Sequence, residues 1–254
     1  MTGPWMTTVT SFRHWEAGVL QRFSFQLRDG YVATTTLRFI ISFHCYCQSL
    51  HKEILNNNQL ELLPVMSSFG REDYLVGGTA IALYLGHRRS IDFDMFKYAS
   101  INHKKNLDKF YEKGFPIQVT RRVQEQMNLI VNDVKVTFFQ YPFAIEPTEN
   151  FETYFRLPSL LQLASMKAYA LGRRSKWKDY VDLFFLLKEH YTIADISQCA
   201  TEIFGDLYSE KMFRAQLCYF EDVDYSEEVD YLIPHPPTND EIRNSLTEII
   251  QKGI

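Results

Sequence analysis

A pair of neighbouring glycines, Gly77-Gly78, lies between two apolar runs and constrains the fold more than any other feature of the chain. The first run, Tyr74-Leu75-Val76, has the aromatic and β-branched character of a short strand, and the glycines allow a sharp turn or a close approach to a ligand. We expect Thr79 to be the N-cap of a helix over residues 80–85 that ends at Gly86. A strand, a tight turn and a helix in succession direct backbone N–H groups and the positive end of the helix dipole toward the turn, where a triphosphate would fit.

Residues 91–96, Ile-Asp-Phe-Asp-Met-Phe, alternate strictly between apolar and acidic side chains, which predicts a strand. Asp92 and Asp94 then project from the same face. Two adjacent carboxylates repel each other unless a cation lies between them, and hard oxygen ligands suit Mg²⁺. Either motif alone is usually only a turn or a solvated strand face, but their combination across one short helix predicts metal-assisted phosphoryl or nucleotidyl transfer.

The overall composition limits the other classes of function. With 254 residues, 46% hydrophobic and 23% charged, the chain can bury one or two domain cores, and no apolar run is long enough to span a membrane. The formal net charge of -4 gives no general attraction to nucleic acid, so such binding would need a local basic patch. Two basic groups occur, His87-Arg88-Arg89 and the set Arg173, Arg174, Lys176 and Lys178. The four cysteines show no CxxC spacing, so the sequence indicates neither a zinc site nor a disulfide framework, and a reducing cytoplasm is the expected location.

These patterns predict a mixed α/β (α+β) fold, with strands and helices in the first part of the chain and an all-helical second half. Residues 1–50 are poor in acids and are predicted to be an atypical N-terminal extension, which we interpret as an overcalled start or a variable appendage. Residues 51–150 are predicted to form the nucleotidyltransferase-type core and residues 151–254 the helical domain. Residues 221–230 are strongly acidic and are predicted to be a solvated loop. The expected helices span 50–69, 104–113, 159–171, 176–190 and 240–251, and the further strands span 117–122, 127–131 and 134–139.

The last two of these strands are separated by Asn132-Asp133, a turn pair, and are predicted to form a hairpin. The second strand of the hairpin should lie beside the strand that carries Asp92. Thr137 then stands where a third carboxylate would complete a metal site.

Four separated segments in this order resemble the AbiEii/AbiGii toxin family of nucleotidyltransferases. They are Val76–Ala80, His87–Asp94, Met166–Ala168 and Lys178–Leu183. The resemblance covers about residues 50–250. It implies a minimal nucleotidyltransferase core of the polymerase-β type, with a mixed sheet flanked by helices, followed by a C-terminal helical bundle, with the active site between them. It further implies the toxin half of a type IV toxin–antitoxin or abortive-infection system, with NTP, Mg²⁺, an RNA acceptor such as tRNA, and a cognate antitoxin protein as partners.

The same resemblance assigns roles to individual residues. Asp92 and Asp94 would bind the metal as catalytic residues, with Asp182 and Lys167 completing the catalytic set and Asp179 supporting it. The nucleotide-binding residues implied are Gly77, Gly78, Thr79, Arg89, Lys167 and Lys178.

One departure from the family pattern keeps other functions open. Thr137 cannot ligate Mg²⁺ as a carboxylate does, so either Asp182 substitutes for the third acid, the metal is held more weakly, or catalysis has been lost. The alternatives are a non-catalytic nucleotide- or RNA-binding module of the same fold and a nucleotidyltransferase that modifies a small molecule such as an antibiotic. Neither the base of the NTP nor the acceptor follows from phosphate and metal motifs.

Overall fold

The computed structural model describes residues 22–26, 32–36 and 50–252. The chain divides into two compact units, residues 1–47 and 48–254. In the first unit, β1 (Arg22–Gln26) and β2 (Val32–Thr36) form an antiparallel pair. The interpretation of residues 1–50 as an overcalled start falls mostly outside the described residues and stays a prediction.

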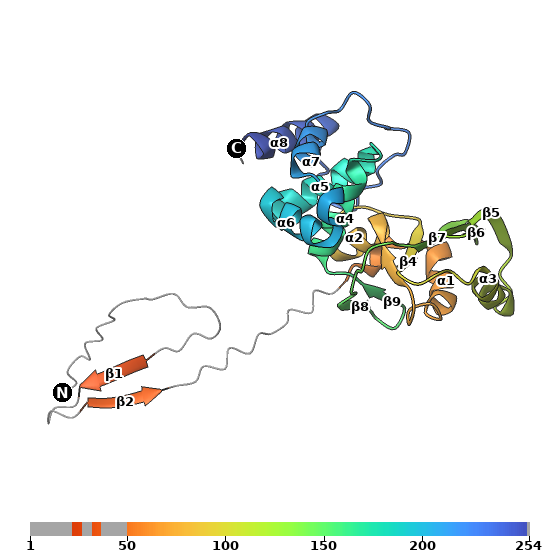
Figure 1. Cartoon of the computed structure of the whole chain (residues 1–254), viewed down its shortest axis with the longest axis horizontal. Helices are drawn as coiled ribbons and strands as arrows, with labels where there is room; N and C mark the ends of the chain where they lie inside the picture. Colours follow the sequence, from red (N-terminus) through yellow and green to blue (C-terminus); the bar gives the residue numbers. More distant parts are fainter. Residues whose placement is uncertain (1–21, 27–31, 37–49, 253–254) are drawn as a thin grey trace. The chain divides into compact units, whose positions relative to one another are not determined.

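The second unit is built on a five-stranded mixed sheet (Figure 1). Its strand order is β3-β4-β7-β6-β5, and every neighbouring pair is antiparallel except β4 and β7, which run parallel. This sheet confirms the predicted fold class. The five strands are β3 (Tyr74–Val76), β4 (Phe93–Lys97), β5 (Ile117–Val123), β6 (Gln126–Val131) and β7 (Val134–Gln140).

The pairing of β4 with β7 confirms the prediction that the second strand of the hairpin lies beside the acidic strand. Asp94 lies directly opposite Thr137 in the parallel register. The predicted hairpin between β6 and β7 is also confirmed, and its turn residues Asn132 and Asp133 have φ of 50° and 59°. Two consecutive residues with positive φ make the turn type whose twist matches that of the flanking strands.

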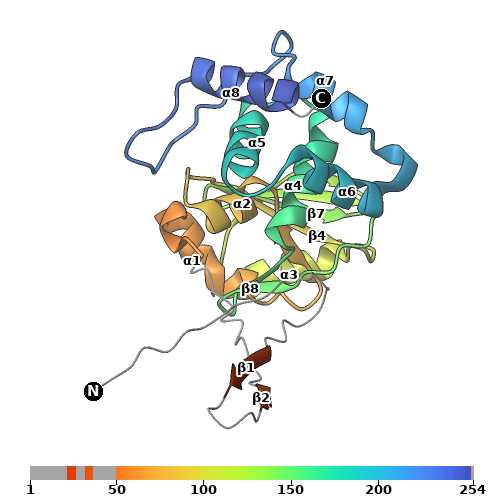
Figure 2. The same ribbon diagram turned by 90° about the vertical axis from the view of Figure 1, so that its left-hand side faces the viewer.

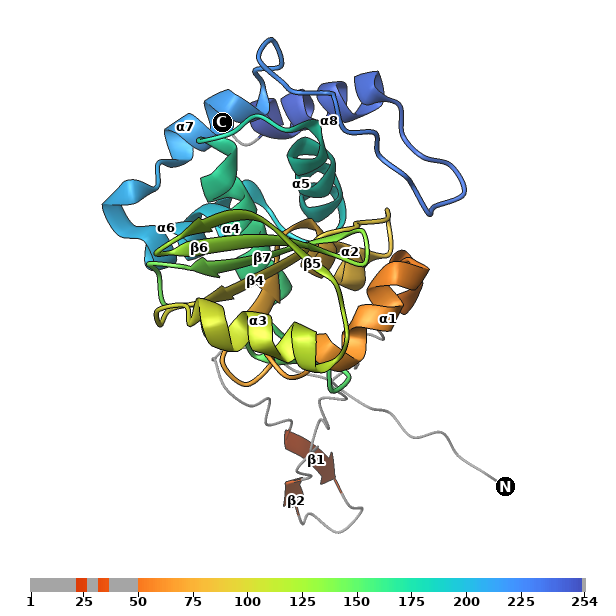
Figure 3. The ribbon, with the colours of Figure 1, turned by 90° about the vertical axis from the view of Figure 1, so that its right-hand side faces the viewer.

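Helices cover both faces of this sheet (Figure 3): α3 packs on one face, whereas α2, α4 and α5 lie on the other. Helices α7 and α8 lie beyond α5, at the end of the unit farthest from α3 (Figure 2). Besides a short 3₁₀ turn at Lys52–Ile54 and another at Gly205–Leu207, the helices are α1 (Asn57–Met66), α2 (Gly77–Leu85), α3 (His103–Glu112), α4 (Leu160–Leu171), α5 (Trp177–Glu189), α6 (Ile193–Phe204), α7 (Glu210–Leu217) and α8 (Asn239–Lys252).

The predicted start of the helix after the glycine pair was wrong. Helix α2 already begins at Gly77, with Val76 in the N-cap position and no capping side chain. Gly77 has φ of 74°, a conformation that glycine adopts without strain, so the chain turns directly from β3 into the helix. The hydroxyl of Thr79 is buried and donates to the carbonyl oxygen of Asp92 at 2.5 Å instead of capping the helix.

Other boundaries also differ from the sequence prediction. The helix expected over 50–69 is interrupted at Leu55, and α1 starts after the capping box that Asn56 forms with Gln59. An unpredicted hairpin, β8 (Glu149–Phe151) with β9 (Phe155–Leu157), precedes the helical half, and α6 and α7 were not predicted either. No helix among the described residues is long and apolar enough to cross a membrane.

Candidate active site

A cleft of about 420 Å³ opens between the sheet and helix α4. Asp94 and Thr137 contribute to its floor from β4 and β7, while Lys167 lines it from α4. Gly77, at the turn from β3 into α2, forms part of its wall. The turn, the acidic strand and the helical half that the sequence motifs singled out therefore meet at one cavity.

The glycine turn and the acidic strand are in direct contact within this cleft. A Cβ atom built on Gly77 would lie 2.5 Å from Oδ2 of Asp94, which is closer than any side chain could approach. Glycine at this position therefore serves two needs, the positive φ and the space for the carboxylate. The first turn of α2 has no side-chain cap, so its backbone N–H groups are available to an anion beside Asp94.

The two carboxylates of the Asp-x-Asp motif carry uncompensated negative charge. Strand β4 begins at Phe93, so Asp92 lies one residue before the strand and Asp94 within it. Burial raises the pKa of Asp92, and the charge of Asp94 raises it further. Burial also raises the pKa of Asp94, although a hydrogen bond from Thr137 acts in the opposite direction. Within residues 50–252, no cationic side chain forms an ion pair with either carboxylate.

These residues fit a divalent cation that takes only part of its ligands from the protein. In the described part of the chain, no three His, Cys, Asp or Glu side chains lie close enough to hold a metal by themselves. Mg²⁺ characteristically binds one or two carboxylates and completes its octahedron with water and substrate phosphate oxygens. Asp92 and Asp94 supply such a donor pair, and Thr137 supplies no charge.

Asp182, by contrast, is already saturated by cations. Its carboxylate is completely buried and accepts hydrogen bonds from Nε and Nη2 of Arg88 at 2.7 and 2.8 Å. The Nζ atom of Lys167 lies 2.9 Å from Oδ2, and Nε2 of His87 lies 2.9 Å from Oδ1. Burial alone would raise the pKa of Asp182, but the charges of Arg88 and Lys167 lower it well below its usual value.

Lys167 and Asp179 belong to the same buried network. The Nζ atom of Lys167 donates to Asp179 at 2.8 Å, and its side chain is only 4% exposed. Arg174 contacts the other oxygen of Asp179 at 3.1 Å. The two acids predicted from the helical half thus hold α4, α5 and the loop after α2 together through buried ion pairs.

The network also depends on the second glycine of the turn. A Cβ atom on Gly78 would meet the Nη2 atom of Arg88 at 2.6 Å. Arg88 is 2% exposed and spans from the loop after α2 to Asp182 on α5. Gly78 therefore makes room for a guanidinium group, whereas Gly77 makes room for a carboxylate.

The remaining predicted nucleotide-binding cations lie outside the cleft lining and have partners. Arg89 pairs with Asp230 at 3.2 Å, and Lys178 pairs with Glu227 at 3.3 Å. Thr79, as described, uses its hydroxyl on the Asp92 carbonyl. The structure thus brings Gly77, Asp94 and Lys167 together in the cleft lining. The predicted site residues that lie outside this lining are Gly78, Thr79, Arg89, Asp92, Lys178, Asp179 and Asp182.

Sequence reasoning missed most of the other residues that line the cleft. Lys135 and Phe139 are two positions from Thr137 on either side, so period-two alternation along β7 was a signal that could have found them. Lys135 forms no ion pair within residues 50–252, and its charge lowers the pKa of Asp94. The other missed lining residues include Phe96, Gln126, Asn128, Tyr141 and Tyr169, whereas Arg173 and Arg174 belong to the basic group noted in the sequence.

Aromatic rings gather at the end of the cleft away from Lys135. The ring of Phe96 lies 5.1 Å from Phe139 and 5.0 Å from Tyr141 between centroids. On the helical side, the guanidinium of Arg173 stacks 3.5 Å above the ring of Tyr169. One end of the cleft therefore carries the Asp94 carboxylate and the Lys135 ammonium group, and the other combines aromatic rings with the guanidinium of Arg173.

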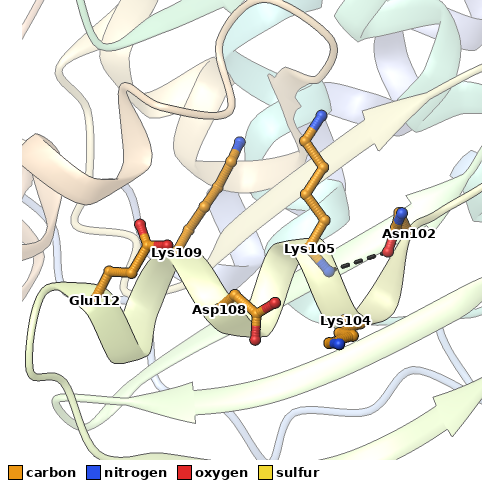
Figure 4. A pocket seen from close by; sticks show the side chains of 6 residues that line it. All are labelled: Asn102, Lys104, Lys105, Asp108, Lys109 and Glu112. Atoms are coloured by element: carbon orange, nitrogen blue, oxygen red, sulfur yellow. Dashed lines mark hydrogen bonds between the residues drawn. The ribbon is translucent and has the colours of Figure 1, made fainter.

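A second hollow, along α3, has a different character (Figure 4). Lys104, Lys105 and Lys109 line it together with Asp108 and Glu112. Lys105 pairs with Glu72 at 2.6 Å, and Lys109 donates to a backbone carbonyl. The lining of this hollow comes from α3 and the residue before it and carries charges of both signs. It contains none of the predicted site residues.

Comparison with known proteins agrees with the fold and gives no family assignment. No family model matches the chain. A curated relative, the uncharacterized protein aq_aa25 of Aquifex aeolicus (strain VF5), is 28% identical over 178 residues, which is 66% of this chain and 84% of the relative.

Among solved structures, JHP933 of Helicobacter pylori is 16% identical and covers 80% of this chain and 93% of its own, with a TM-score of 0.48. MenT4, a nucleotidyltransferase toxin of Mycobacterium tuberculosis H37Rv, is 14% identical and covers 76% of this chain and 80% of its own, with a TM-score of 0.52. The mixed sheet flanked by helices is thus the fold of a nucleotidyltransferase.

Proposed function

We propose that the protein is a Mg²⁺-dependent nucleotidyltransferase that transfers a nucleotide from an NTP to RNA, with tRNA the first acceptor to test. The observation that carries the proposal is the graded chemistry of the cleft, from the Asp94 carboxylate, which has no ion-pair partner in the described chain, at one end to aromatic rings at the other. A nucleotide has the same gradient, since its triphosphate binds metal and its base is a flat aromatic ring system that stacks on other rings.

The triphosphate would lie against the first turn of α2, where Gly77 exposes backbone N–H groups beside Asp94. Lys135 supplies a cation without an ion-pair partner in the described chain at the same end. Asp92 and Asp94 would hold Mg²⁺, which when bound neutralises charge on the phosphates and favours attack of an acceptor hydroxyl on the α-phosphate.

The base would lie between the rings of the sheet and those of α4. Aromatic side chains bind nucleobases by stacking, at about 1–3 kcal/mol per base. Gln126 and Asn128 bond to each other through their amides at 2.9 Å, and each amide retains further hydrogen-bonding groups for the edge of a base. Asp182, Lys167 and Asp179 would act by positioning the helical half relative to the sheet.

The resemblance to the AbiEii/AbiGii family, together with the toxin named in the MenT4 structure, supports a role as a bacterial cytoplasmic toxin with a cognate antitoxin. Growth arrest would follow from modification of the acceptor RNA. Expression without an antitoxin should then slow bacterial growth, and the Asp92→Ala/Asp94→Ala variant should not.

The test is incubation of the purified protein with total bacterial RNA, Mg²⁺ and each α-³²P-labelled NTP in turn. Label should appear on RNA with the wild type and disappear with Asp92→Ala/Asp94→Ala. Asp108→Ala, an exposed acid on α3 in the second hollow, is the matched control and should transfer normally.

A specific observation favours one rival. Thr137 stands opposite Asp94, where a third carboxylate would strengthen metal binding, so the same fold could bind a nucleotide without turnover. Measurable binding of Mg·NTP with no label on any acceptor would select that rival. Label on a small acceptor such as an aminoglycoside, and none on RNA, would select the small-molecule transferase.

A further inference from the structure

The connection between α7 and α8 contains an acidic segment that is fixed at both of its ends (Figure 2). We call residues 224–230 the acidic strap. At its first end, the backbone N–H of Trp177 donates to the carbonyl of Asp224 at 3.0 Å. At its other end, the N–H of Arg89 donates to the carbonyl of Asp230 at 2.8 Å. The loop predicted from composition is therefore exposed as expected, but it is also held across the start of α5 and the loop after α2.

The strap places one carboxylate between two lysines. Glu227 contacts Nζ of Lys176 through one oxygen and lies 3.3 Å from Nζ of Lys178 through the other. The side chains are partly exposed, at 47% for Glu227, 41% for Lys176 and 25% for Lys178. Exposed ion pairs contribute little free energy, so a phosphate could replace the carboxylate at small cost.

This ion-pair group lies beside the candidate metal ligands. The negative charge of Glu227 raises the pKa of Asp92, and the charge of Lys178 lowers it. Asp230 of the same strap pairs with Arg89, three residues before Asp92. The strap thus neutralises three cations in the neighbourhood of Asp92: Lys176 and Lys178 at the start of α5, and Arg89 in the loop after α2.

We propose that Lys176 and Lys178 form a binding site for a backbone phosphate of the acceptor RNA, and that Glu227 occupies this site in the free protein. The proposal rests on the proposed function, because it takes the acceptor to be a nucleic acid strand. Two ammonium groups held around one carboxylate supply positive charge and hydrogen-bond donors. The oxygens of a phosphodiester group are negatively charged and accept such hydrogen bonds. Acceptor binding then requires Glu227 to leave, so the strap competes with RNA.

The experiment measures the affinity of a fluorescein-labelled single-stranded oligoribonucleotide by anisotropy, without Mg²⁺ or NTP. Glu227→Gln should bind about fivefold more tightly than the wild type, because the competing charge is removed. Glu228→Gln is the matched control: it removes the same charge from an exposed neighbour that pairs with no cation in the described chain, and it should change affinity less than about twofold.

Variants of the two lysines complete a double-mutant cycle with Glu227. Lys176→Gln/Lys178→Gln should weaken binding, and Glu227→Gln should bring no improvement in that background, since the site that it uncovers is then absent. Glu227→Gln should also steepen the dependence of log Kd on log salt by about 0.7 for each additional phosphate that the protein neutralises. Equal improvement from Glu227→Gln and Glu228→Gln, an improvement that persists without the lysines, or no RNA binding by any variant would overturn the proposal.

These outcomes are separable from those of the proposed function. Binding is measured without turnover, so the predicted pattern with no label transfer would reject the transferase and retain the phosphate site. Label transfer by the wild type without the predicted binding pattern would retain the transferase and reject the phosphate site.

Discussion

Two pairs of aspartates predicted as site residues are in opposite electrostatic states, and of the four only Asp94 lines the cleft. Asp92 and Asp94, on the sheet side, have no ion-pair partner in the described chain and have raised pKa values. Asp182 and Asp179, on the helical side, are enclosed by Arg88, Lys167 and Arg174. An aspartate in this fold is therefore a candidate metal ligand only where its charge is left uncompensated. A saturated aspartate of the same type is part of the scaffold.

Asp94→Asn is the most severe test of this contrast. Removal of a metal ligand should lower nucleotide transfer by roughly 10³-fold or more. The free energy of unfolding should stay the same or increase, because a buried charge without a cationic partner is lost. Label transfer and urea denaturation of the same preparation test both statements. A large loss of stability would show that Asp94 belongs to the scaffold after all.

Asp182→Asn should have the opposite profile. Removal of the acid leaves Arg88 buried without its counter-charge and Lys167 with Asp179 alone, so the free energy of unfolding should fall by about 3–5 kcal/mol. Urea denaturation with Asp108→Asn as the surface control measures this. If Asp182→Asn were as stable as the wild type but inactive, Asp182 would belong with the metal ligands instead.

Asp73 extends the contrast to a buried acid away from the cleft. Burial raises its pKa to about 6, and one of its oxygens has no hydrogen-bond partner. Between pH 4 and 6 the folded state keeps a proton that the unfolded state has lost, so this group lowers stability as pH rises. Asp73→Asn should therefore be more stable than the wild type by roughly 2 kcal/mol at pH 7. The advantage should vanish near pH 4 in urea titrations, and a gain that is equal at both pH values would contradict it.

Thr137 should have the mildest influence of these residues. Its hydrogen bond lowers the pKa of Asp94, so Thr137→Val should raise that pKa further. Calorimetric titration should show Mg²⁺ affinity reduced about tenfold, because a carboxylate with a higher pKa holds its proton more tightly against the metal, and the deficit should shrink as pH rises. Thr137→Ser keeps the hydroxyl and should bind Mg²⁺ as the wild type does. Equal affinities for all three proteins would show that Thr137 does not tune the metal ligand.

The elements with a strong local signal were predictable. Alternation of apolar and polar residues and the turn pair Asn132-Asp133 predicted the strands between Ile117 and Gln140. Helical spacing of apolar residues and, for the first of them, a glycine at its end predicted the helices at 160–171, 177–189 and 239–252. The start of α2 was missed because Thr79 is a good N-cap by type, whereas the tertiary fold uses its hydroxyl on Asp92. Local preference gave way to a contact thirteen residues along the chain.

The candidate site was predictable only in part, for a physical reason. Spacing places Asp92 and Asp94 together because both belong to one strand segment. The partners of Asp182 come from residues 94 and 15 positions away, Arg88 and Lys167, and no local pattern reports such pairings. The aromatic end of the cleft combines β4, β7 and α4. A sequence shows the type of each residue, but the compensation of its charge is a property of the assembled fold.

The close packing of Arg88 against Gly78, where a Cβ atom would lie 2.6 Å from the guanidinium group, has an evolutionary consequence. Any side chain at position 78 would displace the guanidinium group and, through it, disturb Asp182 and Lys167. Positions 78, 88 and 182 must therefore change together or stay unchanged. In descendants of this chain, the loss of the second glycine should be accompanied by a shorter residue at 88 and an uncharged one at 182. Substitutions in the turn and in the helical half should therefore occur together.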